Sequence, residues 1–436
     1  MTPKPPTVPS DWPFAHAYSF RRDPLAFMSS LARDYGDIAH YEVGTNQFYY
    51  LNHPDLIKDL LVTQDRQFIK YFNVERTREF LGNGLFVSEG EFHTRQRRIA
   101  QPFFHHQRIA SYATKIVQLT MQMCEPWKDA DSLDISKEMN RVTMLIAAQT
   151  LFGADFAKET EQVRIALNEI LDEFDHTMLP PGESDDFQQA LKRLDEPIYS
   201  MLEARRPTFD QHDDLLSSLM QVHLAEGTAD EMTDRQLRDE AMTIFIAGHE
   251  TTANALSWTW YLLSEHPEIA KALREEVDAV LGDRLATFED VPKLQLAERI
   301  FAESLRLYPP LWIIGRQAMA DVKIGPYDVA KNSYCFVSPF VMQRDPRYFP
   351  DPEKFNPDRW LPEAKAERPK YSYFPFSGGS RSCLGENFAW MEGALIMATV
   401  VQNWRVKVKP NHTIKLQTNL TLRSRYGMPV VLESRE

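Results

Sequence analysis

The chain has 436 residues, of which 43% are hydrophobic and 11% aromatic, so it can bury a large core and does not resemble a disordered chain. Its formal net charge of −13 disfavours a nucleic-acid-binding protein, because nucleic-acid phosphates attract basic surfaces. Residues 1–13 are Pro-rich and contain no long apolar run, so we expect an extended arm, no membrane anchor and a cytoplasmic protein. The three cysteines, Cys124, Cys335 and Cys383, form a sparse and odd-numbered set that argues against a disulfide framework or a structural zinc site.

The first half of the chain is predicted to contain one hairpin followed by many helices. Residues 37–51 alternate around Gly44 and predict a β-hairpin, and residues 54–62 predict a helix that starts with proline. Residues 91–284 are mostly helical, because apolar residues recur at threes and fours between prolines. We expect a loop at 179–186 between two of these helices.

The longest predicted helix covers residues 233–266. Thr233 and Gln236 can form a capping box at its start, and Pro267 ends the run. Short strands follow and are predicted at Val322–Ile324, Tyr334–Val337, Arg405–Val408, Thr413–Leu416 and Leu420–Arg423. We therefore expect a mainly α protein with a minor antiparallel β portion, folded as a single domain over residues 1–436.

The segment from Phe376 to Gly385 reads FSGGSRSCLG and contains the most informative pattern. Its two central glycines permit unusual dihedrals, so that the backbone can approach a flat ligand. A helix is expected after Cys383, and free N–H groups at a helix N-terminus favour the thiolate form of a cysteine. Arg381 adds a cation for a carboxylate, and Gly385 leaves room beside a macrocycle. The alternative is an ordinary buried cysteine next to a glycine turn.

The pattern F-x-x-G-x-R-x-C-x-G resembles the cysteine-ligand loop of cytochrome P450 enzymes. Three further segments follow the order of that family along the chain, namely AGHETT at 247–252 in the central helix, the E-x-x-R motif ESLR at 303–306, and FNPDRW at 355–360. The resemblance implies the cytochrome P450 fold, with a long central helix over haem b and the Cys383 thiolate as iron ligand. Trp360 replaces the usual Phe, and Ser377 stands where Gly is frequent. Neither is expected to touch the chemistry, although Ser377 can alter hydrogen bonds near the sulfur.

The same resemblance assigns roles to residues in the central helix. Thr251 would hydrogen-bond dioxygen at the haem, Glu250 would feed protons from solvent, and Ala247 and Gly248 would lie against the cofactor. A glycine inside a helix costs about 1 kcal/mol relative to alanine, so we expect local widening of the helix at Gly248. The alternative is that Thr251 bonds back to its own helix while Glu250 lies in a solvated notch. His249 is expected to be structural.

The two haem propionates need cations or other donors, and the candidates are His93, Arg97, Arg316 and Arg381. His93 and Arg97 are four residues apart and share a helical face, although a solvated basic face is the alternative for Arg97. Glu303, Arg306 and Arg359 resemble the buried Glu–Arg–Arg cluster of the family. That cluster is structural and holds the loop that leads to the cysteine.

Electrons are expected to come from other proteins, because no flavin-binding or iron–sulfur segment follows the haem region. The resemblance to prokaryotic members implies a ferredoxin or flavodoxin with an NAD(P)H-dependent reductase, and we expect the oxygenase itself to be a monomer. Arg95, Arg98 and Arg108 stand out in an acidic chain and are candidates for docking an acidic electron donor.

The resemblance predicts a monooxygenase that inserts one atom of O2 into a C–H bond of a hydrophobic small molecule. A fatty acid, terpenoid, steroid or polyketide would suit the apolar pocket residues that we expect from their position relative to the motifs, namely Tyr71, Phe72, Leu85, Phe86, Phe174, Met178, Phe245, Leu311, Trp312, Ile313, Ile314 and Leu422. Three alternatives stay open: a peroxygenase that uses hydrogen peroxide, a haem-based gas sensor or electron carrier, and a helical protein without a cofactor.

Overall fold

A computed structural model of the protein describes residues 3–155, 159–176, 184–223 and 232–435. The chain divides into two compact units, Met1–Glu75 with Ala302–Cys383, and Arg76–Phe301 with Leu384–Glu436. The chain passes between the units at three points, within α4 (Phe72–Leu81), within α13 (Gln295–Leu307) and between Cys383 and Leu384. A single domain over residues 1–436 stays a prediction.

The first unit contains a five-stranded sheet with the order β1-β2-β8-β5-β3. Its strands are β1 (Ile38–Val43), β2 (Asn46–Leu51), β3 (Phe68–Lys70), β5 (Ile314–Ala318) and β8 (Tyr334–Val337). The predicted hairpin is confirmed: β1 and β2 are antiparallel and turn at Gly44, whose φ of 62° favours glycine. The β portion also contains a parallel pair, β2 with β8, which the sequence does not predict. A long connection between two strands permits this direction, whereas a short turn does not.

Short helices and one small hairpin complete the first unit. They are α1 (Ala15–Arg22), α2 (Pro24–Tyr35), α3 (Pro54–Lys58), α14 (Pro339–Met342), α15 (Pro362–Ala366), β6 (Val322–Ile324) and β7 (Tyr327–Val329). α3 continues as a π-helix over Asp59–Thr63, so the predicted helix from Pro54 to about Val62 is confirmed with a change of winding. Apolar residues of both helical turns, among them Ile57 and Leu61, pack in the core of this unit with the sheet residue Val337.

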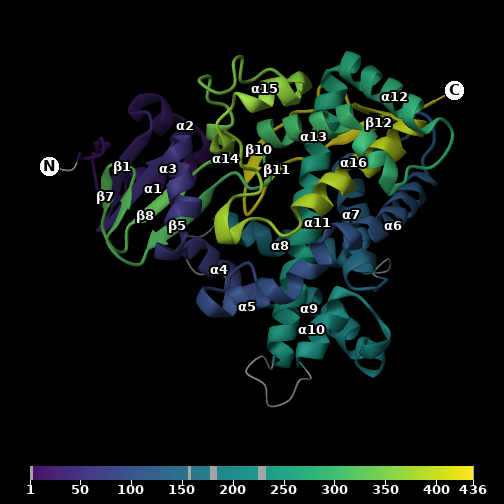
Figure 1. Ribbon diagram of the computed structural model, residues 1–436, viewed down its shortest axis with the longest axis horizontal. Coiled ribbons are helices and arrows are strands. Elements are labelled where there is room, and N and C mark those ends of the chain that lie inside the picture. Colours follow the sequence, from purple (N-terminus) through teal and green to yellow (C-terminus); the bar gives the residue numbers. More distant parts are fainter. Residues whose placement is uncertain (1–2, 156–158, 177–183, 224–231, 436) are drawn as a thin grey trace. The chain divides into compact units, whose positions relative to one another are not determined.

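The second unit is mostly helical and is arranged around α11 (Asp234–Glu265), which packs along α7 (Figure 1). Its other helices are α5 (Gly90–Ala100), α6 (His106–Cys124), α7 (Ile135–Leu151), α8 (Thr160–His176), α9 (Asp185–Arg205), α10 (Leu215–His223), α12 (Pro267–Leu281) and α16 (Glu386–Asn403). α11 has 32 residues and is therefore about 48 Å long. The predicted capping box is present, with Gln236 N–H donating to Thr233 Oγ1 at 3.2 Å and Thr233 N–H donating to Gln236 Oε1 at 2.8 Å.

Two small β elements belong to the second unit. One is a three-stranded sheet with the order β4-β12-β9, formed by β4 (Ser132–Asp134), β9 (Trp404–Val408) and β12 (Pro429–Ser434). The other is an antiparallel hairpin of β10 (Leu416–Thr418) and β11 (Leu422–Ser424). The strand predicted over 413–416 is displaced toward the C-terminus, because β10 starts at Leu416, which pairs with Ser424, and the hairpin turns at 419–421.

The predicted loop over 179–186 is only partly within the described residues, since 177–183 lie outside them. Its end is wrong by two residues. Asp185 and Asp186 already form the first turn of α9, because Ser184 caps the helix by accepting from Phe187 N–H at 3.1 Å.

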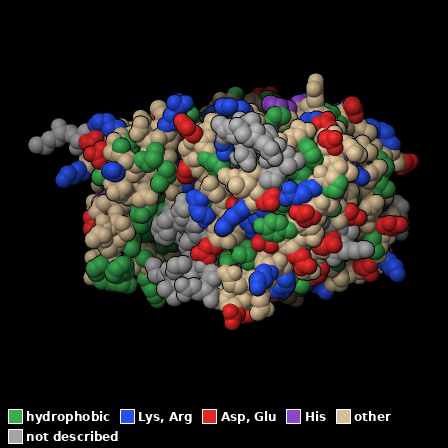
Figure 2. All heavy atoms as spheres, turned by 90° about the horizontal axis from the view of Figure 1, so that it is seen from below, with side chains coloured by type: hydrophobic (Ala, Val, Ile, Leu, Met, Phe, Trp, Pro, Cys, Tyr) green, Lys and Arg blue, Asp and Glu red, His purple; other side chains and the backbone are tan. Residues whose placement is uncertain are grey.

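The surface carries charges of both signs. Figure 2 shows acidic and basic side chains intermixed over the face that it presents. Within the described part of the chain, no helix combines the length and apolar character that a membrane crossing requires.

Candidate functional site

Cys383 ends a tight loop of the first unit. Its backbone N–H donates to the carbonyl oxygen of Phe376 at 3.0 Å, which closes the loop on itself. Ser377 and Gly379 lie within it at φ values of 62° and 68°, in the left-handed region that favours glycine. Along the chain, α16 begins three residues after the cysteine, with Gly385 at its N-cap. The sequence therefore predicts this local order correctly.

The two glycines of the loop are required by packing within the first unit. A Cβ atom on Gly379 would lie 1.9 Å from the carbonyl oxygen of Leu61, which belongs to the π-helix. A Cβ atom on Gly378 would lie 2.8 Å from the ring of Tyr371. The structure thus gives both glycines a packing role within the protein, and the predicted approach of the backbone to a flat ligand stays a prediction.

The three thiols have different environments. Burial raises the pKa of Cys124 to about 12 and the pKa of Cys335 well above its ordinary range, so both stay protonated and packed. Cys383 is exposed. It is therefore the thiol that a ligand can reach, because a buried apolar site suppresses the reactive thiolate form.

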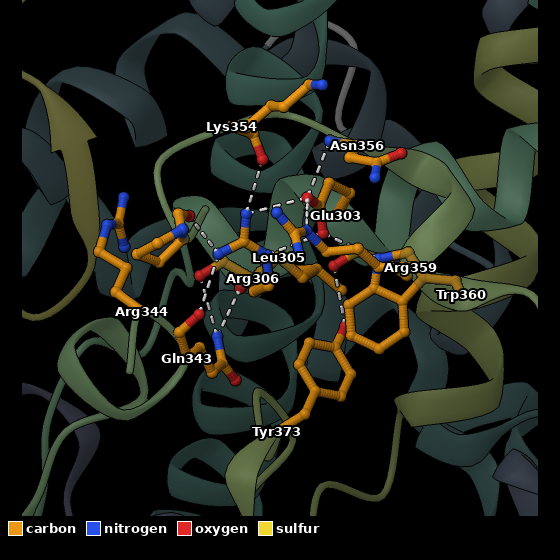
Figure 3. Close-up of polar contacts among 12 residues, drawn as sticks. Glu303, Leu305, Arg306, Gln343, Arg344, Lys354, Asn356, Arg359, Trp360 and Tyr373 are labelled. Carbon is orange, nitrogen blue, oxygen red and sulfur yellow. Dashed lines mark hydrogen bonds and ion pairs between the residues drawn. The ribbon is translucent and has the colours of Figure 1, made fainter. Parts of the chain in front are cut away.

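Glu303 and Arg306 form a fully buried ion pair on α13 (Figure 3). Arg306 donates through Nε and Nη2 to the two carboxylate oxygens, at 2.8 and 2.9 Å. Arg359 adds a third interaction, from Nε to Glu303 Oε1 at 3.3 Å. The predicted Glu–Arg–Arg cluster is thus assembled, and its carboxylate is well supplied with donors.

The buried cluster is tied to the segment that leads to Cys383. Arg306 Nη1 donates to the carbonyl oxygen of Gln343 at 3.0 Å. The side chain of Gln343 then accepts from Phe374 N–H at 3.1 Å, nine residues before the cysteine. Tyr373 donates its hydroxyl to Ala302 O at 3.1 Å. Through these hydrogen bonds the cluster holds the segment that leads to Cys383, which is the structural role that the sequence predicts.

The middle of α11 leaves one short face uncovered. Most of the helix is buried, yet Ala247 is exposed and Gly248 and Thr251, at helical spacing, are half-buried. The helix stays α-helical throughout, so the predicted widening at Gly248 is wrong. A Cβ atom on Gly248 would lie at ordinary contact distances from Ala147 and Leu151 of α7, 3.6 and 3.7 Å.

Glu250 and Thr251 are adjacent on this helix but have different surroundings. Glu250 is 5% exposed, and its Oε1 accepts hydrogen bonds from Asn254 Nδ2 at 2.9 Å and Thr421 Oγ1 at 3.0 Å. It does not lie in a solvated notch. Thr251 Oγ1 donates to Ala247 O at 2.9 Å, which is the back-bonded arrangement kept open as an alternative. A hydroxyl that donates its single hydrogen still has lone pairs with which to accept.

His249 has the structural environment expected for it. It is fully buried, and its Nδ1 bonds the carbonyl oxygen of Phe245 at 2.8 Å. Burial lowers the pKa of His249, and the charge of Glu250 offsets only part of that effect. The imidazole is therefore neutral, and the Phe245 bond places its hydrogen on Nδ1.

The four propionate candidates are divided between the units. His93, which is buried, and Arg97, which is half-buried, lie one turn apart on α5 of the second unit. Arg316 is buried on β5 of the first unit, where Nη1 donates to the carbonyl oxygen of Gly315 at 3.0 Å. Arg381 lies in the 3-10 turn Gly379–Arg381, two residues before the cysteine.

The predicted substrate contacts fall into three groups. Leu85 and Phe86 in the second unit and Tyr71, Leu311 and Ile313 in the first are half-buried, so part of each side chain is accessible, whereas Ile314 is buried. The structure assigns others to packing: Phe245 contacts Phe152 and His249, Trp312 stacks on Phe20, and Leu422 is fully buried. Phe72 and Phe174 have side chains outside the described ones, and Met178 lies outside the described residues.

The basic residues predicted to dock an electron donor differ in their availability. Arg108 forms an ion pair with Asp213, so its charge is already compensated. The guanidinium of Arg95 lies over the ring of Phe92, 5.1 Å from the centroid. Arg98 is exposed on α5.

Comparison with known proteins assigns the fold and the cysteine loop to one family. The family model for cytochrome P450 matches residues 3–428. The chain belongs to the cytochrome P450 family. Cyclooctatin synthase of Streptomyces melanosporofaciens is 35% identical over 95% of this chain and 93% of its own length. Cyclooctat-9-en-7-ol 5-monooxygenase of the same organism is 35% identical over 94% and 91%, and Pentalenene oxygenase of Streptomyces avermitilis is 32% identical over 92% and 90%.

As a P450, the protein is a haem b-dependent monooxygenase that uses O2, electrons from redox partners and a hydrophobic substrate. The described residues fit the cofactor. The exposed thiol at the end of a closed loop suits an iron ligand, and the uncovered face of α11 can accept a flat apolar group. The mainly α fold with small sheets, predicted from the sequence, is confirmed.

Three polar residues of this P450 escape prediction from the sequence. Asn254 follows Glu250 by four positions on a helix, and this spacing could have indicated their hydrogen bond. Thr421 and Trp360 act across 171 and 57 positions. No local pattern in the sequence predicts either of these two contacts.

Proposed function

We propose that this P450 hydroxylates a cyclic terpenoid, with Cys383 as the iron ligand and with Glu250 and Thr251 as its proton-delivery pair. The observation that carries the assignment lies on α11, where a buried carboxyl adjoins a half-exposed hydroxyl at the uncovered face in the middle of that helix. In this pair, the carboxyl of Glu250 can carry a proton, and the hydroxyl of Thr251 can form a hydrogen bond with dioxygen. It favours an oxygenase over a peroxygenase, which needs no proton-delivery pair.

Cys383 is proposed to hold the iron through its thiolate sulfur. Haem, when bound, supplies the activation of dioxygen, for which protein side chains alone are unsuited. Two hydrogen bonds of the chain hold the cysteine loop in place, from Cys383 N–H to Phe376 O and from Phe374 N–H to the side chain of Gln343. Both restrict the movement of the sulfur.

Glu250 and Thr251 are proposed to carry protons in turn. The carboxyl of Glu250 takes a proton from solvent water and gives it up toward the dioxygen site. The hydroxyl of Thr251 is held by Ala247 O and therefore presents its lone pairs, so it can accept a hydrogen bond there. His93 and Arg97, together with Arg316 and Arg381, are proposed to hold the two propionates.

The substrate assignment is supported by relatives and by the accessible apolar side chains. Two relatives are named for alkenes, one of which carries an alcohol: Cyclooctat-9-en-7-ol 5-monooxygenase and Pentalenene oxygenase. Phe86, Leu311 and Ile313 offer accessible apolar surface of the kind that a compact hydrocarbon needs. We therefore favour a terpenoid over a fatty acid, steroid or polyketide.

A ferredoxin or flavodoxin with an NAD(P)H-dependent reductase is proposed as the electron source, and the oxygenase is proposed to act as a monomer. Exposed Arg98 supports an acidic donor, since complementary charge accelerates encounter. Charge reversal by Arg98→Glu should slow reduction by such a donor while leaving substrate binding intact. Light scattering after size-exclusion chromatography tests the monomer.

The iron ligand is tested by Cys383→Ser, with Cys124→Ser as the matched control. The reduced, carbon monoxide-treated parent and control should show the red-shifted absorption of a thiolate-bound haem, and Cys383→Ser should lose it. An unchanged Cys383→Ser spectrum would overturn the assignment.

The proton-delivery role is tested by Thr251→Ala against Thr259→Ala, which removes a buried hydroxyl elsewhere on α11. Thr251→Ala should keep consuming O2 but divert it to hydrogen peroxide. Preserved coupling would refute the assignment.

The substrate class is tested by adding cyclic terpene hydrocarbons and alcohols, fatty acids, steroids and polyketides to the purified protein. Terpenoids should give the largest substrate-induced absorbance change and an oxygenated product by mass spectrometry. A stronger response to another class would replace the terpenoid.

A further inference from the structure

Glu250 is held by a closed triangle of hydrogen bonds. Its Oε1 accepts from Asn254 Nδ2 at 2.9 Å and from Thr421 Oγ1 at 3.0 Å, and Asn254 Nδ2 also donates to Thr421 Oγ1 at 3.1 Å. All three residues are at most 5% exposed. Glu250 and Asn254 come from α11, whereas Thr421 comes from the turn between β10 and β11.

The hydrogen atoms in this triangle can be assigned without conflict. Asn254 uses its two amide hydrogens on Glu250 Oε1 and Thr421 Oγ1, and Thr421 uses its one hydroxyl hydrogen on Glu250 Oε1. Two donors thus point at Oε1, so a proton on that oxygen would have no acceptor and would meet two other hydrogens. Among the described residues, both hydrogen bonds that the Glu250 carboxyl accepts end on Oε1, and none is found at Oε2. Oε2 is therefore the oxygen on which a proton can be gained and lost.

The β10–β11 hairpin, which contains Thr421, forms a second hydrogen bond with α11. Trp258, one turn after Asn254, donates its indole N–H to the carbonyl oxygen of Leu422 at 3.1 Å. The position of the Thr421 hydroxyl is therefore fixed by the backbone next to it and does not depend on the triangle alone.

The same hairpin is also bound to α8. Asn419 Nδ2 donates to the carbonyl oxygen of Leu171 at 3.1 Å. Arg423 donates to Asn168 Oδ1 and to Asp172 Oδ1, each at 2.6 Å. The β10–β11 hairpin therefore connects the end of α8 to the carboxyl of Glu250, and all three elements belong to the second unit.

We propose that Asn254 and Thr421 are positioning residues that hold Glu250 by Oε1 and leave Oε2 as its proton-exchanging atom. In each cycle Oε2 takes one proton from water and releases one proton toward Thr251, so Glu250 returns to its starting charge. The inference rests on the proposed proton-delivery role of Glu250, and it adds the β10–β11 hairpin to that machinery. A buried carboxylate that loses a donor either rotates or draws in water, and both outcomes make proton transfer less direct.

The main test is Thr421→Val, which keeps the size of the side chain but removes the hydroxyl. Thr421→Ser restores the hydroxyl, and Asn254→Leu removes the other donor. Thr259→Val is the matched control, because Thr259 is a buried threonine whose hydroxyl donates to Ala255 O of its own helix. Haem content and the carbon monoxide spectrum are measured first, and each variant is compared at equal haem.

Two measurements report on proton transfer. With a surrogate ferredoxin and reductase, and with the compound that gives the largest absorbance change, Thr421→Val and Asn254→Leu should each increase the fraction of electrons lost to hydrogen peroxide several-fold. Both should also increase the solvent isotope effect on turnover. Thr421→Ser and Thr259→Val should match the parent.

A third measurement does not depend on turnover. Amide hydrogen exchange over residues 419–424 should become faster in Thr421→Val, because one of the ties between the hairpin and α11 is lost, and it should return to the parent rate in Thr421→Ser. Unchanged exchange together with unchanged peroxide formation would overturn the proposal.

Glu250→Gln separates failure of the inference from failure of the proposed function. If Glu250→Gln changes peroxide formation and the isotope effect while Thr421→Val and Asn254→Leu do not, the positioning role is wrong and the proton-delivery role survives. If Glu250→Gln behaves like the parent, the proton-delivery role itself is wrong.

Discussion

The indole Nε1 of Trp360 donates a hydrogen bond to Oε2 of Glu303 at 3.0 Å. Glu303 is fully buried and receives further hydrogen bonds from Arg306, Arg359 and the backbone N–H of Asn356 (Figure 3). The family pattern has phenylalanine at the position of Trp360, and phenylalanine has no donor. The indole therefore adds a hydrogen bond that the usual residue does not make.

Trp360→Phe should lower stability even though it restores the family residue. The smaller phenyl ring loses some packing against Tyr373, and a buried carboxylate loses one donor, a bond worth about 1.5–3 kcal/mol. The urea midpoint of the haem-loaded protein measures the loss. Trp404→Phe is the control: Trp404 is half-buried and packs edge-on against Trp127, so we expect a smaller effect. Equal midpoints for Trp360→Phe and the parent would show that the indole bond contributes nothing.

Arg306→Lys should be one of the most disruptive conservative changes in the first unit. Arg306 binds both oxygens of Glu303 and three backbone carbonyl groups, those of Gln343, Pro352 and Lys354. A lysine ammonium has three donors on one nitrogen and cannot reach all five acceptors. Breaking a buried charged network costs about 3–5 kcal/mol, so haem retention should fall sharply on heating.

Arg33→Lys provides the matched control for that measurement. Arg33 pairs with Asp34 on the surface, with 71% of its side chain exposed, so the same substitution there should change stability by less than about 1 kcal/mol. Similar haem retention in the two variants would contradict the importance of the buried network.

Ser377→Gly should stabilise the cysteine loop. Ser377 has a φ of 62°, and a left-handed conformation costs a residue with a side chain about 1–2 kcal/mol. The greater freedom of glycine in the unfolded chain offsets part of this gain, which leaves roughly 0.5–1 kcal/mol. Thermal unfolding measures it. Ser382→Gly in the same loop should instead destabilise, because its φ is −57°, and a gain there would contradict this explanation.

Glu240 should make the protein more stable in mild acid than in mild base. The pKa of Glu240 is raised from 4.5 to about 8, mainly by burial and in part by the charge of Asp239, while the hydrogen bond from Leu85 N–H opposes the rise. Between these two values the folded state holds a proton that the unfolded state has released. This contribution is complete below pH 4.5 and is lost as the pH rises through about 8, with a slope of at most about 1.4 kcal/mol per pH unit.

Glu240→Gln should flatten this dependence, because the amide does not titrate and its oxygen can still accept from Leu85 N–H, which donates to Glu240 Oε2 at 3.0 Å in the parent. Urea midpoints from pH 5 to pH 9 provide the measurement. Glu268→Gln, on the exposed start of α12, should keep the slope of the parent. An equally steep slope in Glu240→Gln would assign the pH dependence to other groups.

The sequence predicts what depends on neighbours along the chain. Thr233, Gln236 and Pro267 define the ends of α11, and Gly44 defines the first hairpin, because caps and turns are local. The strand register near Thr413 is not local. It depends on the pairing of Thr418 with Leu422 and on the contacts of the hairpin with α8 and α11.

The candidate site divides in the same way. The order of Phe376, Arg381 and Cys383 is visible in the sequence, and so is the adjacency of Glu250 and Thr251. What surrounds each of them is not, because Thr421 reaches Glu250 across 171 positions. The sequence also does not show why residue 379 is a glycine. A side chain there would collide with the carbonyl oxygen of Leu61, more than 300 residues earlier in the chain.

The parallel pairing of β2 with β8 constrains how the protein is made. Tyr334 of β8 pairs with Phe48 of β2, 286 positions earlier. During synthesis at about 5–20 residues per second, the β1–β2 hairpin must wait roughly 15–60 s for its partner strand. Throughout that interval the backbone groups of β2 that pair with β8 in the folded protein are unpaired, and the aromatic side chains of β2 lack their packing partners from β8. Newly made chains should therefore be most prone to aggregation before residue 338 emerges, and chaperones that bind extended apolar segments should act on the first 75 residues.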